Sequence, residues 1–466
     1  PNGGTLFGTT TATVVNGVAT FNNVSMRKAG NYTLGATATN APAAATSDSF
    51  TINPGAATAF VVAGFPSPTT AGDAHNFNVT AQDTFGNTAT GYTGTVHFTS
   101  TDGQSGLPAN STLTNGGGVF SATLKTAGSQ TLTATDTANS SITGTSTSIT
   151  VNAAATDHFA VVAPASATAG AAFDFTVTAK DPFNNTTTGY SGTVHFTTSA
   201  GNATLPADST LTNGAGTFSA TIRTAGNQTL TATDTVTASI AGSSNAIAVS
   251  PTAATHIAVS APSSATAGSA FSFTVTAQDQ FNNTGTGYAG TVHFTSSDGN
   301  ATLPADSTLT NGAGTFSATL RTAGNRTITA TDTVASTING TSNTIAVSPA
   351  AATHLAVAAS PNATAGVSFD FGVLALDQFN NLATGYGGTV HFTSSDGNAS
   401  LPADSTLTGG AGTFSVTLRT AGNQTITATD TITSSITGTS NTIAVSPTAA
   451  THFTVVAPGI VAPGIA

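Results

Sequence analysis

The sequence predicts an all-β protein built of tandem β-sandwich domains, and three observations lead to this. An eight-residue stretch, Tyr288–Thr295 (YAGTVHFT), recurs as Tyr92–Thr99, Tyr190–Thr197 and Tyr386–Thr393, at a spacing of 98 residues each time. Within it, Tyr, Val and Phe alternate with Thr and His, as in a strand that buries one face. Turn residues separate several more alternating segments, and helical periodicity is absent. A motif that returns at a fixed spacing marks a repeated structural unit.

The spacing divides the chain into one partial and four complete repeats. The complete repeats are residues 58–155, 156–253, 254–351 and 352–449. Residues 1–57 match the second half of a repeat, since Arg27–Leu34 aligns with Arg223–Leu230 at two full periods. About 41 residues of that first domain are missing, and a chain that starts at Pro1 is expected to be a processed product or a fragment. Half a sandwich exposes its inner faces, so we expect residues 1–57 to be unstable alone.

Residues 450–466 begin another first strand and then repeat the pentad Val-Ala-Pro-Gly-Ile. The strand is expected to be the first strand of a further repeat or a donor strand. Pro-Gly pairs form turns, so the rest of the segment is expected to be a flexible tail or a segment that orders only on a partner. The joints between repeats, such as 250–255, are short and lack glycine. We therefore expect semi-rigid linkers and an arrangement of beads on a string, in the form of a rod.

The third repeat stands for all four. Strands are expected at 256–260, 271–277, 288–295, 315–321, 327–333 and 344–348, with a short edge strand at 307–310. Turns are expected at 265–268, 279–283, 297–300, 311–312 and 323–325, which are rich in Gly, Asn, Asp and Ser. Seven or eight short strands in 98 residues are typical of a β-sandwich with its own core.

The composition excludes several classes of function. Eight Lys and Arg against nineteen Asp and Glu give a net charge of −11, which argues against nucleic acid as a partner. Only 6% of the residues are charged, yet no run of about 18 apolar residues predicts a membrane span. Thr, Ser and Asn supply the polar surface instead. The chain contains no cysteine, which suits an extracellular or cell-surface protein of bacteria.

One stretch carries a family resemblance: Phe273–Asp279, Asn282-Asn283, Thr291–Phe294, Gly314–Leu320 and the Ala323-Gly324…Thr329-Ala330 segment. It resembles the bacterial immunoglobulin-like (Big) repeats of the invasin and intimin stalk type. The usual Gly-Asn turn is kept at Gly86-Asn87 but is Asn-Asn in later repeats, and the Pro that usually follows is absent. The resemblance covers nearly the whole chain. It implies spacers, fibres or adhesin stalks on or outside a bacterial cell, with no catalytic residues.

Calcium is the one cofactor that the sequence raises: the repeated Asp279, Asp298, Asp306 and Asp332 could bind it at the joints between repeats. The best candidates are Asp332, at a strand end, and its equivalents Asp234 and Asp430. Calcium needs six to eight oxygen ligands, and no Asp-x-Asp-x-Asp run is present, so local turn hydrogen bonds are the alternative interpretation. Two sets of histidines recur: His97, His195, His293 and His391, and His158, His256, His354 and His452. Both sets are expected to be exposed, with a joint contact as the alternative.

The row of outward threonines at 229, 231, 233 and 235 suggests a face for ice or a glycan. Ice binding requires threonines on several neighbouring strands, and the adjacent strand is expected to offer Ser, Asn and Ala. Motifs of hydrolases, zinc proteases and phosphate-binding loops are absent, so no catalytic residue is predicted.

The leading functional hypothesis is a structural extracellular protein, a fibre or adhesin stalk that polymerises head to tail by strand addition. Its expected partners are copies of itself. The first alternative is an adhesin that binds host or matrix glycans, or ice, through the Thr-rich faces. The second alternative is the non-catalytic arm of an enzyme.

Overall fold

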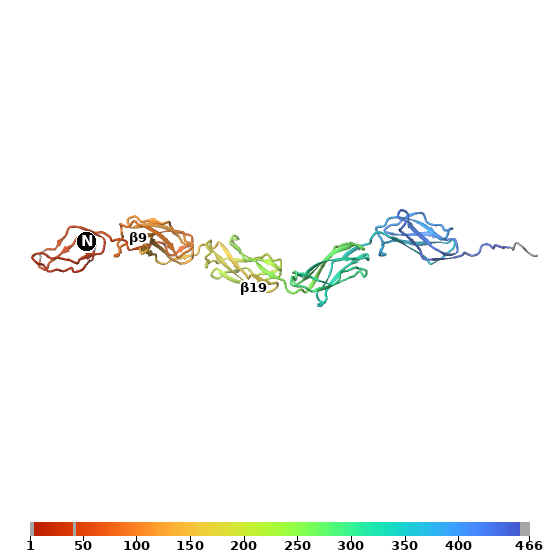
Figure 1. Ribbon diagram of the computed structural model, residues 1–466, viewed down its shortest axis with the longest axis horizontal. Helices are drawn as coiled ribbons and strands as arrows, with labels where there is room; N and C mark the ends of the chain where they lie inside the picture. Colours follow the sequence, from red (N-terminus) through yellow and green to blue (C-terminus); the bar gives the residue numbers. More distant parts are fainter. Residues whose placement is uncertain (1–3, 41–42, 457–466) are drawn as a thin grey trace, which may run out of the picture. The chain divides into compact units, whose positions relative to one another are not determined.

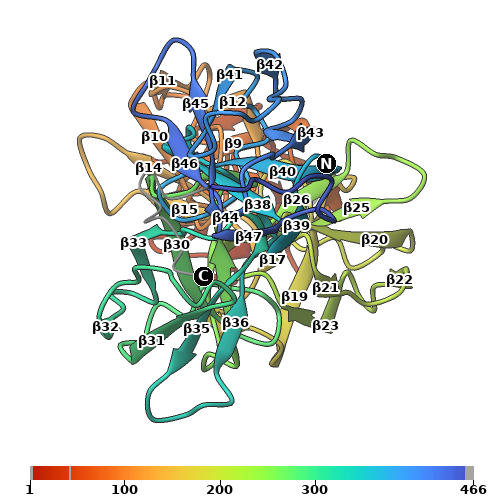
Figure 2. The ribbon, with the colours of Figure 1, turned by 90° about the vertical axis from the view of Figure 1, so that its right-hand side faces the viewer.

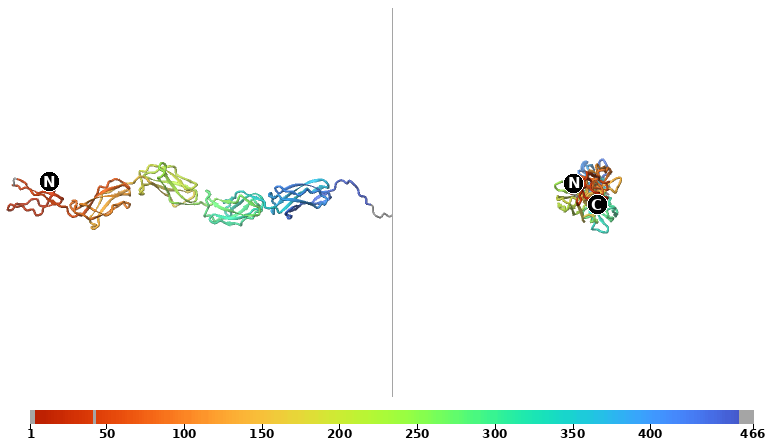
Figure 3. Two further views of the ribbon diagram at one scale, coloured as in Figure 1. Left: turned by 90° about the horizontal axis from the view of Figure 1, so that it is seen from above. Right: turned by 90° about the vertical axis from the view of Figure 1, so that its left-hand side faces the viewer.

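The computed structural model describes residues 4–40 and 43–456, and these residues form strands and loops but no helix (Figure 1). No segment of the described chain is therefore a helix long and apolar enough to cross a membrane. The chain divides into two compact units, Pro1–Val249 and Ser250–Ala466. The two pentads after Val455 lie almost wholly outside the described residues. Figure 3 shows in two further views that every repeat consists of strands joined by loops.

The third repeat contains ten short strands. They are β28 (His256–Ser260), β29 (Ser264–Thr266), β30 (Ala270–Gln278), β31 (Thr291–Ser296), β32 (Ser307–Thr308), β33 (Ala313–Thr319), β34 (Gly324–Arg326), β35 (Ile328–Asp332), β36 (Asn339–Thr341) and β37 (Ile345–Ser348). They form three sheets, in the orders β32-β31-β35-β36, β28-β30-β33 and β29-β37-β34. Figure 2 shows β31, β35 and β36 side by side.

The other complete repeats contain the same three sheets, and in the second repeat the additional strand Ala203–Thr204 makes the sheet equivalent to β28-β30-β33 four-stranded. The first consists of β7 (Ala59–Ala63), β8 (Thr69–Thr70), β9 (Ala74–Gln82), β10 (Thr95–Ser100), β11 (Ser111–Thr112), β12 (Gly117–Thr123), β13 (Gly128–Gln130), β14 (Leu132–Asp136), β15 (Thr143–Thr145) and β16 (Ile149–Asn152). The second consists of β17 (His158–Val162), β18 (Ser166–Thr168), β19 (Ala172–Lys180), β20 (Thr193–Thr198), β21 (Ala203–Thr204), β22 (Ser209–Thr210), β23 (Ala215–Ile222), β24 (Gly226–Gln228), β25 (Leu230–Asp234), β26 (Ala241–Ser243) and β27 (Ile247–Ser250).

The fourth repeat consists of β38 (His354–Ala359), β39 (Asn362–Thr364), β40 (Ser368–Leu376), β41 (Thr389–Ser394), β42 (Ser405–Thr406), β43 (Ala411–Thr417), β44 (Gly422–Gln424), β45 (Ile426–Asp430), β46 (Thr437–Thr439) and β47 (Ile443–Ser446). Every buried apolar residue of its core lies between Leu355 and Val445, so no residue from another repeat is needed to complete it. This repeat therefore has the closed core of a domain that folds on its own.

The alternating pattern places the core as the sequence predicts. Along β31, Val292 and Phe294 are buried while His293 and Thr295 are exposed. Phe273 of β30 packs edge-to-face on Phe294 with ring centroids 5.7 Å apart, and Phe316 of β33 lies 4.8 Å from Phe294. Such aromatic pairs add to the stabilisation from burial alone. Three strands of two facing sheets are thus joined through one aromatic cluster.

Close backbone packing explains a glycine in the fourth strand of the larger sheet. A Cβ on Gly340 of β36 would lie 1.7 Å from the carbonyl oxygen of Ile257 on β28. The equivalent Gly438 of β46 faces Leu355 at 1.8 Å in the same way. Because the neighbour is backbone, it cannot move aside, and only glycine fits between the two sheets.

Three details of the predicted repeat are wrong. The expected turns at 265–268 and 323–325 are occupied in part by strands β29 and β34, which pair with β37 on either side. Strand β36 was not expected. The strand expected from Tyr288 starts only at Thr291, because Tyr288 ends a loop and packs partly buried against the core.

The partial repeat at the start consists of short strand pairs. These are β1 (Leu6–Phe7) with β2 (Ser25–Met26), β3 (Gly30–Tyr32) with β6 (Phe50–Ile52), and β4 (Gly35–Ala36) with β5 (Ala45–Thr46). Val14, Val15 and Val18 are 56%, 64% and 63% exposed. Apolar residues are thus exposed in this half-domain, as the sequence predicts.

Candidate functional site

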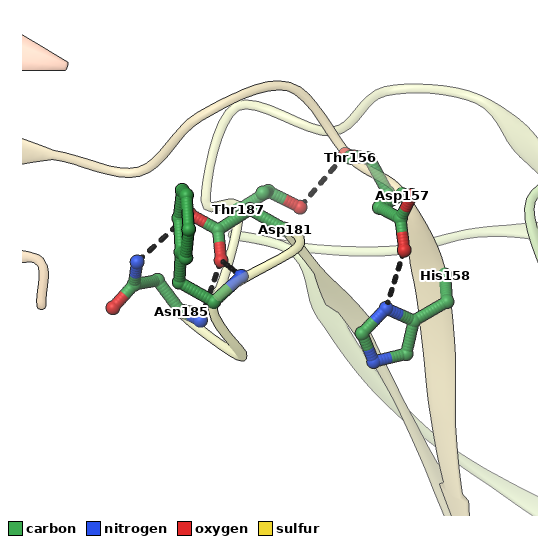
Figure 4. A network of polar contacts seen from close by, with 7 residues as sticks. Thr156, Asp157, His158, Asp181, Asn185 and Thr187 are labelled. Carbon is green, nitrogen blue, oxygen red and sulfur yellow. Dashed lines mark hydrogen bonds and ion pairs between the residues drawn. The ribbon is translucent and has the colours of Figure 1, made fainter. Parts of the chain in front are cut away.

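The polar groups that recur in every repeat gather at the joints between repeats, and the turn after β19 shows how. Asp181 is fully buried, and its Oδ1 accepts the backbone N–H groups of Phe183 and Asn185, at 2.9 and 2.8 Å. Its Oδ2 accepts the linker N–H of Ala154 and the side-chain amide of Asn185, at 2.9 and 2.8 Å. Figure 4 shows Asn185 held beside Asp181. One carboxylate therefore fixes both the linker and the Asn side chain.

Asn185 then reaches the preceding repeat. Its Oδ1 accepts the N–H of Ala127 at 2.8 Å, and its Nδ2 donates to the carbonyl oxygen of Lys125 at 2.7 Å. The ring of Phe183 covers Gly72, where a Cβ would lie 2.6 Å from the ring, and Lys125 Nζ lies 5.8 Å from the ring centroid. We name this arrangement of an Asp-x-Phe-x-Asn turn on the backbone of the preceding repeat the joint latch.

The second compact unit contains the same latch. Asn381 accepts from the N–H of Ala323 at 2.8 Å and donates to the carbonyl of Arg321 at 2.7 Å. Asp377 holds Asn381 and the linker N–H of Ala350. The ring of Phe379 covers Gly268.

The partial repeat is latched to the first complete repeat by the same groups. Asn87 accepts from Ala29 N–H at 2.8 Å and donates to Arg27 O at 2.7 Å, and Asp83 accepts from Gly55 N–H at 2.8 Å. Burial alone raises the pKa of the Asp83 carboxyl, but the bonds from Asn87 and three backbone N–H groups outweigh it and lower the pKa to about 2. The latch therefore contains an ionised carboxylate down to acidic pH.

A second buried carboxylate supports the backbone that the latch holds. Asp298 accepts the N–H groups of Arg321 and Thr322 at 2.6 and 2.9 Å, and the hydroxyl of Thr322 at 2.6 Å. Burial raises its pKa, but these hydrogen bonds prevail and lower it to about 2. Asp102 and Asp396 repeat this arrangement, whereas Ala200 occupies the position in the second repeat.

The calcium candidates Asp234, Asp332 and Asp430 lie in a different cluster. The hydroxyl of Tyr288 donates to Asp332 Oδ2, and the N–H groups of Val334 and Ala335 donate to Oδ1 at 2.8 and 2.7 Å. These bonds, with Ala335 foremost, lower the pKa of Asp332, while burial and Asp332 raise that of Tyr288.

Asp234 and Asp430 are held in the same way, by Tyr190 and Tyr386. Within the described residues, no three His, Asp or Glu side chains lie close enough together to hold a metal ion. Calcium at these three residues stays a prediction, and the cation would have to compete with a tyrosine hydroxyl and two N–H groups.

The strand histidines are exposed, and three of the four pair with acidic side chains. His195, His293 and His391 lie 2.7 Å from Asp208, Asp306 and Asp404, and His97 lies 2.8 Å from Asn110. The histidines of the first strands lie near the joints instead. His158 contacts Asp157, as Figure 4 shows, and His256 and His354 contact Asn282 and Asn380. Each pair is too exposed to contribute much to stability.

The row of threonines on β25 (Leu230–Asp234) extends onto the neighbouring strand β20, which was not expected. Thr231 and Thr233 of β25 lie opposite Thr197 and His195 of β20, while the other neighbour, β26, offers Ser243 and Ala241. In the fourth repeat, hydroxyls of Thr427 and Thr439 are 2.9 Å apart, and those of Thr429 and Thr437 are 2.8 Å apart. The expectation of Ser and Ala on the adjacent strand thus holds for β26 alone.

The sequence analysis did not find the joint latch. The sequence feature that indicates the latch is the last position of the Asp-x-Phe-x-Asn turn. This position is Asn in all four complete repeats (Asn87, Asn185, Asn283 and Asn381), whereas the position before it is Gly or Asn. That preceding residue has a positive φ, 78° at Gly86 and 66° at Asn184, which both residue types tolerate. At Asn87, Asn185 and Asn381, the constant Asn has a different role, because its side chain bonds to the backbone of the preceding repeat.

Comparisons with known proteins give a structural likeness only. No family model matches the chain, and no curated protein matches it. Among solved structures, the Escherichia coli adhesin FdeC is 17% identical, with 62% of this chain and 98% of that chain covered and a TM-score of 0.33. Invasin, a bacterial integrin-binding protein, is 18% identical over 82% of this chain and 78% of its own, with a TM-score of 0.29. InvD of Yersinia pseudotuberculosis is 18% identical, with 61% of this chain and 96% of InvD covered and a TM-score of 0.28.

The likeness to these structures concerns the fold alone, a series of immunoglobulin-like β domains. Domains of intimin are also among the similar structures. The invasin and intimin type of immunoglobulin-like repeat is the one that the sequence resemblance predicts.

Proposed function

We propose that this chain is a structural spacer of a bacterial cell-surface or secreted protein, in which immunoglobulin-like repeats are held in series by joint latches. The observation that carries the proposal is the latch itself. Side-chain amides of Asn185 and Asn381 bond to the backbone of the preceding repeat, so the joint is more than a peptide linker. A spacer requires repeats that keep their relative orientation, and such bonds restrict it.

The remaining polar groups support a structural role. The buried Asp298 and Asp332 accept hydrogen bonds from backbone and tyrosine groups within their own repeat. Only eight Lys and Arg occur in 466 residues, which offers few cleavage sites to trypsin-like proteases outside a cell. The absence of cysteine fits the same location, because the fold does not depend on disulfide formation.

Nuclear magnetic relaxation of a two-repeat segment, residues 254–449, tests the spacer role. Repeats that are latched tumble together, so their rotational correlation times are equal. Asn381→Ala is expected to separate the two correlation times, whereas Asn441→Ala, which removes a bond to Ala359 inside the fourth repeat, leaves them equal. Independent tumbling of the unaltered repeats would refute the spacer role.

The location has its own test. Antibodies against repeat 254–351 are expected to label intact, unpermeabilised cells that produce the protein, or to detect it in their medium. Labelling only after lysis would contradict the proposal.

Polymerisation by strand addition is part of this proposal, since the partial repeat exposes Val14, Val15 and Val18 and the segment 450–456 exposes Phe453 and Val455. Adding the second segment to the first would bury apolar area on both. The sedimentation coefficient is then expected to rise with concentration. Phe453→Ser should abolish this rise, and a constant coefficient would exclude polymerisation.

An adhesin that binds host or matrix glycans is the second candidate, and the three adjacent strands β41, β45 and β46 favour it. They carry outward Thr393, Thr427 and Thr439 in one row and His391, Thr429 and Thr437 in the next. Retention on a glycan array that is lost in Thr427→Val/Thr429→Val would support this function. Binding that is unchanged by the double variant, or absent, would oppose it.

A further inference from the structure

The fourth repeat presents the backbone half of a joint latch without an occupant. The carbonyl of Arg419 and the N–H of Ala421 correspond to the groups of Arg321 and Ala323 that Asn381 binds. Neither group has a hydrogen-bond partner among residues 4–40 and 43–456. A backbone donor and a carbonyl held side by side match the two halves of one Asn amide.

Exposure gives an independent indication. Arg321, Thr322 and Ala323 are partly buried, whereas the equivalent Arg419, Thr420 and Ala421 are exposed. The glycine that faces the latch phenylalanine shows the same contrast. A Cβ on Gly268 would meet the ring of Phe379 at 2.5 Å, but around Gly366 nothing lies within 4 Å. The phenylalanine position is therefore open as well.

The open surface is held in place by hydrogen bonds within its own repeat. Asp396 accepts the N–H groups of Arg419 and Thr420 at 2.6 and 2.8 Å and the hydroxyl of Thr420 at 2.6 Å, as Asp298 does in the occupied joint. Burial raises the pKa of Asp396, but these bonds prevail and lower it. The groups of Arg419 and Ala421 thus need little reordering to bind, which lowers the entropic cost of association.

We infer that the surface formed by Gly366 and Arg419–Gly422 is a docking site for a further immunoglobulin-like repeat that presents an Asp-x-Phe-x-Asn turn. The occupant is a second copy of this type of repeat. The Asn amide would bond to Arg419 O and Ala421 N–H, and the Phe ring would cover Gly366. The argument is continuity with an established interface, because three equivalent surfaces among the described residues hold such a turn. The inference does not depend on the proposed location or spacer role.

The fourth repeat alone provides the test. Residues 348–449 contain a closed core, and when separated they present both the open surface and a free turn, Asp377–Asn381. Copies are therefore expected to associate head to tail. Linked joints act at effective concentrations in the millimolar range, so we expect half-saturation on the order of 1 mM.

Amide spectra of the labelled repeat are recorded over increasing concentration. Chemical shifts are expected to move at Phe379–Asn381 and at Gly366 and Arg419–Gly422, and not elsewhere. Asn381→Ala is expected to abolish the changes at both surfaces, while Asn441→Ala retains them. Shifts that are absent up to about ten times the expected midpoint, that lie on other surfaces, or that persist in Asn381→Ala would overturn the inference.

A second arm uses the whole chain as the acceptor. Dilute labelled repeat 348–449 is mixed with unlabelled full chain, whose fourth repeat offers only the open surface. Shifts are expected at the Phe379–Asn381 turn of the labelled repeat. Ala421→Pro in the full chain removes the N–H donor and is expected to weaken binding at least tenfold. Equal binding to both chains would overturn the inference.

Discussion

The side-chain Nδ2 of Asn381 donates to the carbonyl oxygen of Arg321 at 2.7 Å, across 60 residues of sequence and from one repeat to the one before it. The Oδ1 of the same amide accepts from Ala323 N–H at 2.8 Å. A single amide therefore satisfies one donor and one acceptor of the neighbouring backbone. Asp377 holds the amide in this orientation.

The first prediction concerns this bond. Asn381→Ala removes the partner of the Ala323 N–H, so hydrogen exchange at Ala323 is expected to accelerate about 10- to 100-fold, since a hydrogen bond of this type is worth about 1–3 kcal/mol. Exchange at Ala127 should not change. Asn185→Ala is the matched control and should have the opposite selectivity. Equal exchange at both sites in either variant would show that the amides do not protect these groups.

The second prediction concerns Tyr386, the partly buried tyrosine of the fourth repeat. Tyr386→Phe removes the hydroxyl that donates to Asp430 and leaves the ring in place. The free energy of unfolding of residues 348–449 is expected to fall by about 1–3 kcal/mol, the usual cost when a charged acceptor loses its partner. Urea denaturation measures it. Thr393→Val, at an exposed position of β41, is expected to change the stability by less than about 0.5 kcal/mol.

The third prediction concerns acid. The pKa of Asp298 is about 2 in the folded chain against 3.8 for the free group, so the unfolded state binds more protons as the pH falls. The resulting stability is complete above about pH 4 and is lost as the pH falls towards about 2. This carboxylate contributes on the order of 2 kcal/mol. Urea denaturation of residues 254–449 between about pH 7 and pH 2 measures the free energy of unfolding. In Asp298→Asn, this free energy should fall less steeply as the pH falls from about 4 to about 2.

The fourth prediction concerns the close approach of two sheets. Gly438→Ala would place a Cβ 1.8 Å from the carbonyl oxygen of Leu355, so the strands must separate. Residues 348–449 are expected to lose about 2–4 kcal/mol of stability or to fail to fold. Gly397→Ala is the matched control, because nothing lies within 4 Å of that position. Similar thermal midpoints for the two variants would contradict the packing that the structure shows.

The sequence predicted the strands that alternate, and missed those that do not. Strand β30 alternates Phe271, Phe273 and Val275 with small polar residues, and its position was correct. Strand β29, Ser264–Thr266, has no large apolar residue, and its pairing with Ala346–Ser348 depends on a segment about 80 residues away. Such contacts leave no local periodicity. They explain why two predicted turns are partly strands.

The site was harder to predict than the fold for the same reason. Asp279, Asp298 and Asp332 each recur at the repeat spacing, but their carboxylates differ in partner: the N–H groups of a turn, the backbone segment that the latch holds, and a tyrosine. All three residues recur with the period of the repeat, so their spacing in the sequence does not distinguish their roles. Only the three-dimensional pairing distinguishes a residue that joins two repeats from one that closes its own.

Strand β29 lies parallel to β37, so the first and last parts of a repeat run in the same direction and are bonded to each other. Tension applied to the two ends of the chain would draw these strands in opposite directions along their common axis. The ladder between Ser264–Thr266 and Ala346–Ser348 would then be loaded in shear, with its hydrogen bonds breaking together instead of one after another. A repeat closed in this way resists mechanical extension more strongly than one whose ends lie on antiparallel strands that unzip.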